Sequence, residues 1–401
     1  MTDPIQEWAA RIRKAAADGS AVCLRGGGTK DFLGRTPMGE VLDTRGYTGI
    51  VSYEPSELVV TARAGTPLVE LEAALAEAGQ MLAFEPPRFA PGGTVGGCVA
   101  AGLAGPRRAA VGGVRDFVLG VRLLDGRGDD LRFGGQVMKN VAGYDVARVM
   151  AGSLGTLGLL LEVSLKVLPR PLAEATLAFA LDEPAALERV NAWSGQPLPV
   201  SATAWRAGRL HVRLSGAAAA VEAAIRRLGG EVLADTAAHG LWAALRDHTD
   251  DFFTDDRPLW RLSVLSDAPP LDVPGETLVE WGGAQRWLKG EQSAAELRAR
   301  VAAVGGHATL FRHGDRAGEV FHPLLPAMAA PAASAEADLR SGGRVWTGPP
   351  VRRDVSHADA TRRFHPGYAR RPRGGGDPAQ VRALRLLHRH LPDLPAARRR
   401  A

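Results

Sequence analysis

Three glycine-rich segments, far apart in the chain, constrain its fold more than any other feature. They are 25–29 (Arg-Gly-Gly-Gly-Thr), 91–97 (Pro-Gly-Gly-Thr-Val-Gly-Gly) and 152–158 (Gly-Ser-Leu-Gly-Thr-Leu-Gly). Each lies next to an apolar run with the character of a β-strand. Because glycine has no Cβ, its backbone N–H groups can approach phosphate oxygens closely. Together the segments predict a chain that folds around one large anionic ligand.

The third segment separates this chain from the common dinucleotide-binding proteins. Gly152, Gly155 and Gly158 recur at every third position, whereas the fingerprint G-x-G-x-x-G follows a strand and opens a helix. Here the glycines precede the apolar run 158–168, which is predicted to be a strand. The order of elements therefore argues against a Rossmann fold. The first segment, taken alone, is equally compatible with an ordinary turn.

Charge is distributed unevenly along the 401 residues. Residues 331–401 contain 15 arginines, no lysine and 6 acidic residues, a net charge of +9, so the first 330 residues hold 34 basic and 38 acidic groups. A basic groove for nucleic acid is therefore not expected in the body of the protein. Cys23 and Cys98 lack the spacing of metal ligands and are expected to be small buried residues in a reducing cytoplasm. The sequence has no secretory signal and no apolar run of about 18 residues, so no membrane span is expected.

Apolar periodicity predicts an α+β protein with two domains and a tail. In residues 1–172 we expect helices at 5–18, 66–79 and 145–151, strands at 21–24, 41–43, 49–53, 57–64 and 158–168, and a hairpin at 118–133. In residues 173–328 we expect an antiparallel sheet with strands at 175–181, 210–214, 230–233, 259–264, 277–281 and 307–311, and helices at 184–194, 217–228 and 293–304. Residues 329–401 lose this periodicity and are expected to be an irregular, largely disordered tail.

The order of these motifs resembles a known flavoprotein family. The three glycine-rich segments, with Lys139-Asn140-Val141-Ala142-Gly143-Tyr144-Asp145 before the third, are similar to the PCMH-type FAD-binding domain of vanillyl-alcohol-oxidase-like proteins. The similarity covers roughly residues 20–172 and implies a domain of two subdomains, followed by a cap-type domain. Within this family, 139–148, 151–153 and Gly-Gly-Ala-Gln-Arg-Trp-Leu at 282–288 resemble the FAD-binding subunit of bacterial glycolate oxidase. Leu154 stands where D-lactate dehydrogenase relatives usually carry Glu.

The resemblance assigns a set of residues to non-covalently bound FAD. Residues 26–29 would cradle the pyrophosphate, 92–97 would run beside pyrophosphate and flavin, and 143–156 would line the isoalloxazine or ribityl side. Lys139 would either stabilise negative charge near the flavin or lie on the surface, and Asp145 suits a helix cap equally well. The full set is Arg25, Gly26, Gly27, Gly28, Thr29, Pro91, Gly92, Gly93, Thr94, Val95, Gly96, Gly97, Lys139, Asn140, Gly143, Tyr144, Gly152, Ser153, Gly155, Thr156 and Gly158.

Histidines bear on both attachment of the flavin and catalysis. None occurs before His211, so histidyl attachment of flavin to the first domain is excluded. The catalytic relatives use a histidine-rich metal site, whereas here His307, His313 and His322 are scattered, and we expect no metal site and assign no catalytic residue. The resemblance thus implies a subunit that holds FAD beside a catalytic FAD-containing sister subunit and an iron–sulfur subunit. That complex would oxidise glycolate to glyoxylate in the cytoplasm, attached peripherally to the inner face of the membrane through its partners.

Two other functions and an unusual origin of the tail remain open at this stage. The chain could be a self-sufficient FAD-dependent 2-hydroxy-acid dehydrogenase, or a non-catalytic interaction protein whose basic tail binds nucleic acid. The tail itself suggests a frameshift, because codons for 332–349 and 375–396, read one nucleotide later, can encode F-D-P-x-G…P-G-R and C-x2-C-x2-C-x3-C-P. The first ending is common in this flavin family and the second is an iron–sulfur spacing. Coding DNA without that cysteine motif in the shifted frame would refute the frameshift.

Overall fold

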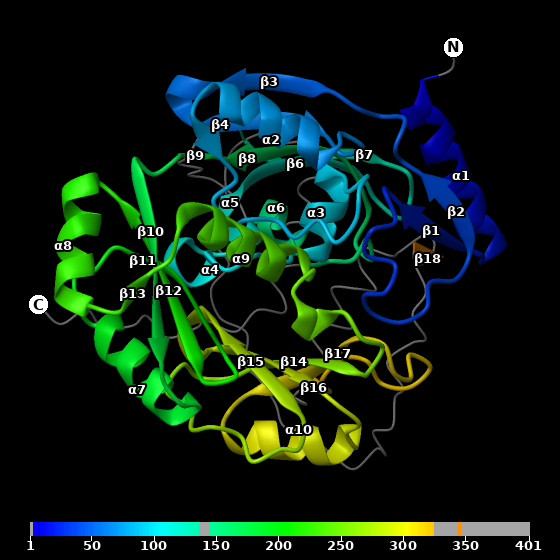
Figure 1. The fold of residues 1–401 in the computed structure, drawn as a ribbon. Helices are drawn as coiled ribbons and strands as arrows, with labels where there is room; N and C mark the ends of the chain where they lie inside the picture. The colour runs from blue at the N-terminus through cyan, green and yellow to red at the C-terminus, as the bar shows by residue number, and fades with distance from the viewer. Residues whose placement is uncertain (1–2, 136–144, 325–343, 346–401) are drawn as a thin grey trace, which may run out of the picture.

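The computed structural model describes residues 3–135 and 145–324 in full and the backbone of 344–345. Lys139, Asn140, Gly143 and Tyr144, which the sequence assigns to FAD, lie outside the described residues, as does most of the predicted tail. The described chain contains four β-sheets with three, five, eight and two strands. Figure 1 shows the three- and five-stranded sheets in the upper part of the molecule and the eight-stranded sheet below and to the left.

The N-terminal helix α1 (Pro4–Asp18) packs on a small sheet of β1 (Ala21–Arg25), β2 (Glu40–Asp43) and β18 (Arg344–Val345). Asp3 begins the helix, because its carboxylate accepts the N–H of Ile5 at 3.0 Å, and Gly19 ends it in a left-handed conformation. The helix buries one apolar face against β1 and β2. Residues 344–345, which the sequence predicted to be irregular, instead pair in parallel with β1.

The five-stranded sheet is antiparallel throughout and carries the main core of the first half. Its order is β3 (Ile50–Glu54), β4 (Val59–Arg63), β8 (Leu159–Lys166), β6 (Val118–Leu124) and β7 (Asp130–Gly134). The predicted β6–β7 hairpin is present, and Asp125 closes its turn by accepting the N–H groups of Arg127 and Asp129. Helices α2 (Leu68–Glu77), α3 (Val95–Ala101), α5 (Val114–Phe117) and α6 (Val146–Val149) adjoin this sheet, whereas α4 (Arg108–Val111) contacts the eight-stranded sheet described next. Strands β5 (Gln80–Met81) and β9 (Leu168–Pro169) form the two-stranded sheet.

The second half is built on the eight-stranded antiparallel sheet. Its order is β13 (Glu231–Val232), β10 (Ala173–Ala180), β12 (Arg209–Gly216), β11 (Val200–Arg206), β15 (Glu276–Glu280), β16 (Gln285–Lys289), β14 (Leu259–Ser263) and β17 (His307–Arg312). Helices α7 (Glu183–Ser194), α8 (Ala218–Leu228) and α10 (Ala294–Ala303) lie on its outer side, while α9 (Asp235–Asp247) lies toward the first half (Figure 1). Ser293 begins α10, as its spacing from Glu296 predicted.

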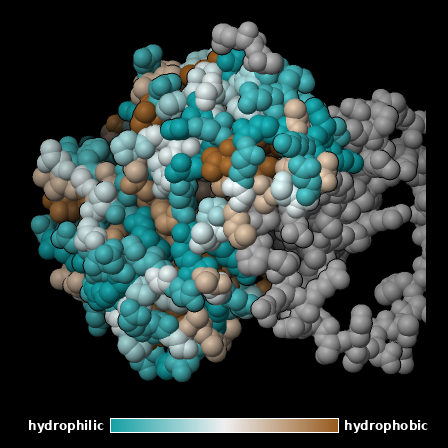
Figure 2. Space-filling view, turned by 90° about the vertical axis from the view of Figure 1, so that its right-hand side faces the viewer, coloured by the Kyte–Doolittle hydropathy of each residue, from teal (hydrophilic) through white to brown (hydrophobic). Residues whose placement is uncertain are grey.

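The sequence missed β11, β16, α3 and α9. Strand β16 is buried along its whole length and therefore shows no alternation of apolar and polar residues. Figure 2 shows the face that carries α1 and the β1–β2 sheet, where hydrophilic side chains predominate and hydrophobic ones form only small, separate patches. Among the described helices, none is both long and apolar enough to span a membrane.

Candidate functional site

The three glycine-rich segments meet at one pocket in the first half of the molecule. Arg25 and Gly26 come from the first segment, Gly96 and Gly97 from the second, and Leu154, Gly155 and Gly158 from the third. The pocket is lined by Leu24, Arg25, Gly26, Thr44, Ala64, Gly96, Gly97, Ala100, Leu154, Gly155, Gly158, Leu159 and Leu160. Thr44, Ala64 and Ala100 also line the pocket, but the sequence did not single them out. The small side chains of Ala64 and Ala100 leave the pocket open.

The first two segments touch so closely that only glycine fits between them. A Cβ on Gly27 would lie 1.7 Å from the carbonyl oxygen of Gly92, and one on Gly26 would lie 2.5 Å from Oγ1 of Thr94. Within the described residues, the N–H groups of Gly26, Gly27 and Gly28 donate no hydrogen bond to another backbone group. A run of free N–H groups in a turn without side chains is suited to bind the oxygens of a phosphate. The geometry therefore fits a pyrophosphate-bearing ligand.

Arg25, which the sequence assigned to FAD, is engaged elsewhere in this structure. Its guanidinium donates to Asp31 through Nε at 2.9 Å and Nη2 at 2.6 Å. These hydrogen bonds raise the pKa of Arg25 further. The pair closes the turn that contains Gly28, whose φ is +70°. Arg25 therefore shapes the first segment, and its charge is already neutralised by a neighbour.

The second segment is half loop and half helix, whereas the sequence predicted only a loop. Thr94 caps α3, because its Oγ1 accepts the N–H of Gly97 at 3.2 Å. Val95, Gly96 and Gly97 thus form the first turn of a helix. The glycine at 96 is required by packing, since its Cβ would lie 2.7 Å from that of Ala64. Val95 is fully buried in the core and does not line the pocket.

The third segment is anchored on the C-terminal end of α3. Gly152 donates its N–H to the carbonyl of Val99 at 3.0 Å, and Leu154 donates to that of Ala100 at 2.8 Å. The segment then runs into β8, as predicted. The hydroxyl of Ser153 is buried and has no hydrogen-bond partner among the described residues. A buried hydroxyl without a partner is unfavourable, so this hydroxyl is open to a hydrogen bond from outside the described residues.

The remaining described residues of the predicted set support the pocket without lining it. Oγ1 of Thr156 donates to the carbonyl of Ser153 at 2.7 Å and closes the third segment. Pro91 and Gly92 are exposed at the start of the second segment. Asp145, whose role was left open, caps α6 by accepting the N–H of Arg148 at 3.3 Å. The supporting residues are Gly27, Gly28, Thr29, Pro91, Gly92, Gly93, Thr94, Val95, Gly152, Ser153 and Thr156.

Comparison with known proteins identifies the family. Residues 3–134 match the model of an FAD binding domain. Over 305 residues the chain is 48% identical to "Glycolate oxidase subunit GlcE" of Escherichia coli strain K12, covering 76% of this chain and 86% of that protein. The chain belongs to the GlcE family of glycolate oxidase subunits. It is therefore an FAD-linked oxidoreductase subunit, and its cofactor is FAD.

Other similar proteins match this GlcE family member over a shorter part of the chain or at lower sequence identity. "Glycolate oxidase subunit GlcD" of Bacillus subtilis strain 168 is 33% identical over 155 residues, 38% of this chain and 33% of that protein. A solved structure of alkyldihydroxyacetonephosphate synthase covers 75% of this chain and 69% of its own, with a TM-score of 0.55 at 14% identity. That likeness supports the fold, which is the predicted α+β arrangement of a PCMH-type FAD-binding domain followed by an antiparallel sheet.

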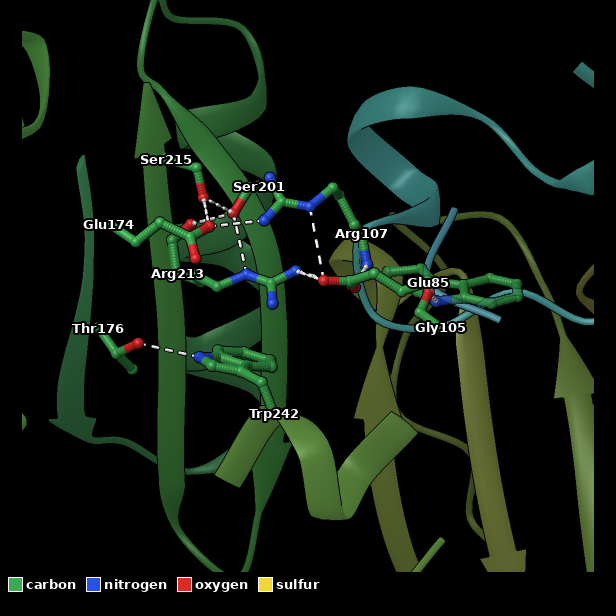
Figure 3. A network of polar contacts seen from close by, with 10 residues as sticks. Glu85, Gly105, Arg107, Glu174, Thr176, Ser201, Arg213, Ser215 and Trp242 are labelled. Carbon is green, nitrogen blue, oxygen red and sulfur yellow. Dashed lines mark hydrogen bonds and ion pairs between the residues drawn. The ribbon is translucent and has the colours of Figure 1, made fainter. Parts of the chain in front are cut away.

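A network of paired charges joins the two halves of the molecule (Figure 3). Nη2 of Arg107 lies 2.6 Å from Glu174, and Nη2 of Arg213 lies 2.9 Å from Glu85. Nε of Arg213 also donates to Ser201 at 3.1 Å. A cavity of about 470 Å³ opens next to these residues, which we call the charged cavity. The sequence could not indicate this network, because its partners are 67 and 128 residues apart.

The histidines that the sequence singled out do not form a cluster with other metal ligands. The rings of His307 and His322 lie 6.3 Å apart. In the parts of the chain that are described, no group of three or more His, Cys, Asp or Glu side chains could hold a metal ion. Cys23 and Cys98 are both buried free thiols, as the sequence predicted.

Proposed function

We propose that this chain holds one FAD non-covalently in the glycine-lined pocket, as a subunit of a complex that oxidises glycolate to glyoxylate. The observation that carries the proposal is the meeting of all three glycine-rich segments at a single pocket. When bound, FAD accepts the electrons of the substrate, and the protein contributes binding, orientation and exclusion of water.

Each segment has a distinct task in this proposal. The N–H groups of Gly26, Gly27 and Gly28 would bind the pyrophosphate, and Thr29 would border it. Gly96 and Gly97 keep the wall of α3 free of side chains. Ser153, whose hydroxyl is buried without a partner, would hydrogen-bond the cofactor at the third segment. The roles of Lys139, Asn140, Gly143 and Tyr144 stay predictions.

Non-covalent attachment follows from the nucleophiles that the first half lacks. No histidine precedes His211 in the sequence. The thiol of Cys98 is fully buried, and this burial raises its pKa to about 12. Since the thiolate is the reactive form of cysteine, Cys98 is unsuited to bond to the flavin. Treatment with acid should therefore release all of the FAD from the protein.

The proposed partners are a catalytic FAD-containing sister subunit and an iron–sulfur subunit that passes electrons to quinone. The names of two relatives, which describe subunits of glycolate oxidase, support an assembly of this kind. We place the complex in the cytoplasm, attached peripherally to the inner face of the membrane through the partner subunits.

Co-purification tests the assembly directly. The full chain, tagged and expressed with the products of its neighbouring genes, should retain a second flavoprotein and an iron–sulfur protein. Acid extraction should then release more than one FAD per complex. A chain that purifies alone, with turnover of glycolate by itself, would contradict the division of labour between subunits and favour a self-sufficient dehydrogenase.

A further inference from the structure

A third pocket lies where the first glycine-rich segment meets the end of the eight-stranded sheet. It has a volume of about 530 Å³. Its walls include Thr29, Phe32, Phe89, Phe253, Arg312 and Arg316, and we call it the arginine pocket. Thr29 belongs to the first glycine-rich segment, so the arginine pocket adjoins the proposed FAD site.

Arg312, at the end of β17, differs from the buried arginines of the charged cavity. Its Cζ atom lies 4.3 Å from the ring centre of Phe32 and 5.3 Å from that of Phe89. Within the described residues its guanidinium has no hydrogen bond and no ion pair. Burial without a counter-ion lowers the pKa of Arg312. The two rings contact its plane, but its N–H donors at the edge stay available to an acceptor.

The other charged groups near Arg312 are mostly positive, which favours binding of an anion. Arg316 donates hydrogen bonds to backbone carbonyl groups, and its Nε lies 2.9 Å from the carbonyl oxygen of Gly34. These neutral partners leave its positive charge uncompensated. Nζ of Lys30 lies 5.7 Å from the ring centre of Phe89. Asp256 is the one acidic residue among the described lining residues, and its side chain is fully exposed beside His313. The pocket is therefore positive, with no carboxylate of its own in contact with Arg312.

A small carboxylate matches these walls better than a neutral or cationic ligand. A guanidinium can bind both oxygens of a carboxylate at once, and this bidentate contact is strong where water is excluded. The rings of Phe32 and Phe89 shield one side of the Arg312 guanidinium from water. The hydroxyl of Thr29 accepts from Nζ of Lys30 at 3.3 Å and can still donate to a hydroxyl or carbonyl oxygen on the neighbouring carbon.

We propose that the arginine pocket binds a small 2-hydroxy acid or its 2-oxo product, with Arg312 holding the carboxylate. The proposal rests on the proposed function, because it places this ligand beside the FAD of the same chain. It goes further by assigning a substrate-type recognition site to a subunit whose flavin-holding role does not require one. Arg312 is a binding residue here, and no proton or electron transfer is assigned to it.

The test is a titration of the FAD-loaded chain with oxalate, a stable dicarboxylate, and with glycolate. Binding is followed by calorimetry and by the change in flavin absorbance. Arg312→Met keeps the aliphatic contact with the rings and removes the charge, so it should weaken oxalate binding by more than about tenfold. Arg312→Lys should restore part of the affinity. The exposed Arg226, on the far helix α8 (side chain 72% exposed), provides the control Arg226→Met, which should bind like the wild type.

The outcomes separate this inference from the proposed function. FAD-loaded wild type that binds neither oxalate nor glycolate at ~10 mM, or Arg312→Met that binds as well as wild type, overturns the carboxylate site but leaves the FAD site intact. Loss of FAD from Arg312→Met without any oxalate binding by the wild type would show that Arg312 contacts the cofactor phosphate instead. A wild-type chain that takes up no FAD refutes the proposed function, and oxalate titration of that chain still decides whether the pocket binds carboxylates.

Discussion

The glycine-rich segments and the charged cavity differ in whether their main polar groups are paired within the chain. In the first and third glycine-rich segments, the N–H groups of 26–28 and the hydroxyl of Ser153 have no partner in the described chain. In the charged cavity, Arg107 and Arg213 reach Glu174 and Glu85 at 2.6 and 2.9 Å. N–H groups and a hydroxyl without protein partners are open to a ligand, whereas charges that are paired within the chain indicate a structural contact.

This difference implies that mutations in the two regions should change different properties. A substitution in the glycine-lined pocket should reduce flavin binding. A substitution in the charged network should instead reduce the free energy of unfolding, because it separates a charge from its buried partner.

The largest effect is expected for Gly27→Ala. A Cβ at this position would lie 1.7 Å from the carbonyl oxygen of Gly92, so the first two segments must move apart. We expect FAD binding to weaken by more than about tenfold, ~1.4 kcal/mol, as measured by flavin fluorescence titration. Gly46→Ala is the matched control, because nothing lies within 4 Å of a Cβ there. Equal FAD affinity in both variants would contradict the close contact of the segments.

Next in size is the effect of Arg213→Met on stability. The side chains of Arg213 and Glu85 are 7% and 17% exposed, so the substitution removes the nearer of two buried cations from Glu85 and leaves it only Arg107, whose Nε lies 3.5 Å away. Removing one partner of a buried pair costs ~3 kcal/mol, which urea denaturation can measure. The flavin content should stay at the wild-type level. A variant that unfolds like the wild type but loses FAD would reverse the roles of the two regions.

A smaller effect concerns the pH dependence of stability through Glu280. Burial raises the pKa of Glu280 to about 7, although Trp287 and Gln285 donate hydrogen bonds to it. Arg261 and Glu85 are the charged groups that act on it. Because the folded-state pKa lies above the usual value, ionisation opposes folding, and this destabilisation grows as the pH rises from about 5 to 7.

Glu280→Gln should therefore raise the melting temperature at pH 7.5 more than at pH 5.5. The measurement is a series of thermal melts of wild type and variant between those two values. The flavin content should be the same in both proteins. A difference in melting temperature that does not change with pH would show that Glu280 carries the same charge throughout this range.

The sequence predicted the residues of the glycine-lined pocket better than it predicted the elements around them. The three segments and the β6–β7 hairpin follow from glycine spacing and from the Asp125 turn. Helix α3 was missed because glycines at 96 and 97 oppose helix formation locally, while the Thr94 cap and packing on Ala64 stabilise it. The network of Arg107 and Arg213 depends on tertiary contacts between distant segments, which no local pattern encodes.

The division of the chain at residue 172 and the frameshifted origin of the tail stay predictions. Arg312 likewise gave no signal in the sequence. It is recognisable only once the structure shows which arginines have a carboxylate partner and which do not.

The most direct test of the account is a substitution that places a large side chain inside the glycine-lined pocket. Ala100 lines the pocket on α3, whereas Ala73 is exposed on α2. Ala100→Phe and Ala73→Phe add the same ring to a helix, and the FAD bound per folded chain is measured after reconstitution. The account predicts about one FAD per chain for wild type and Ala73→Phe and none for Ala100→Phe. Full FAD binding by a folded Ala100→Phe variant would contradict the claim that this pocket holds the cofactor.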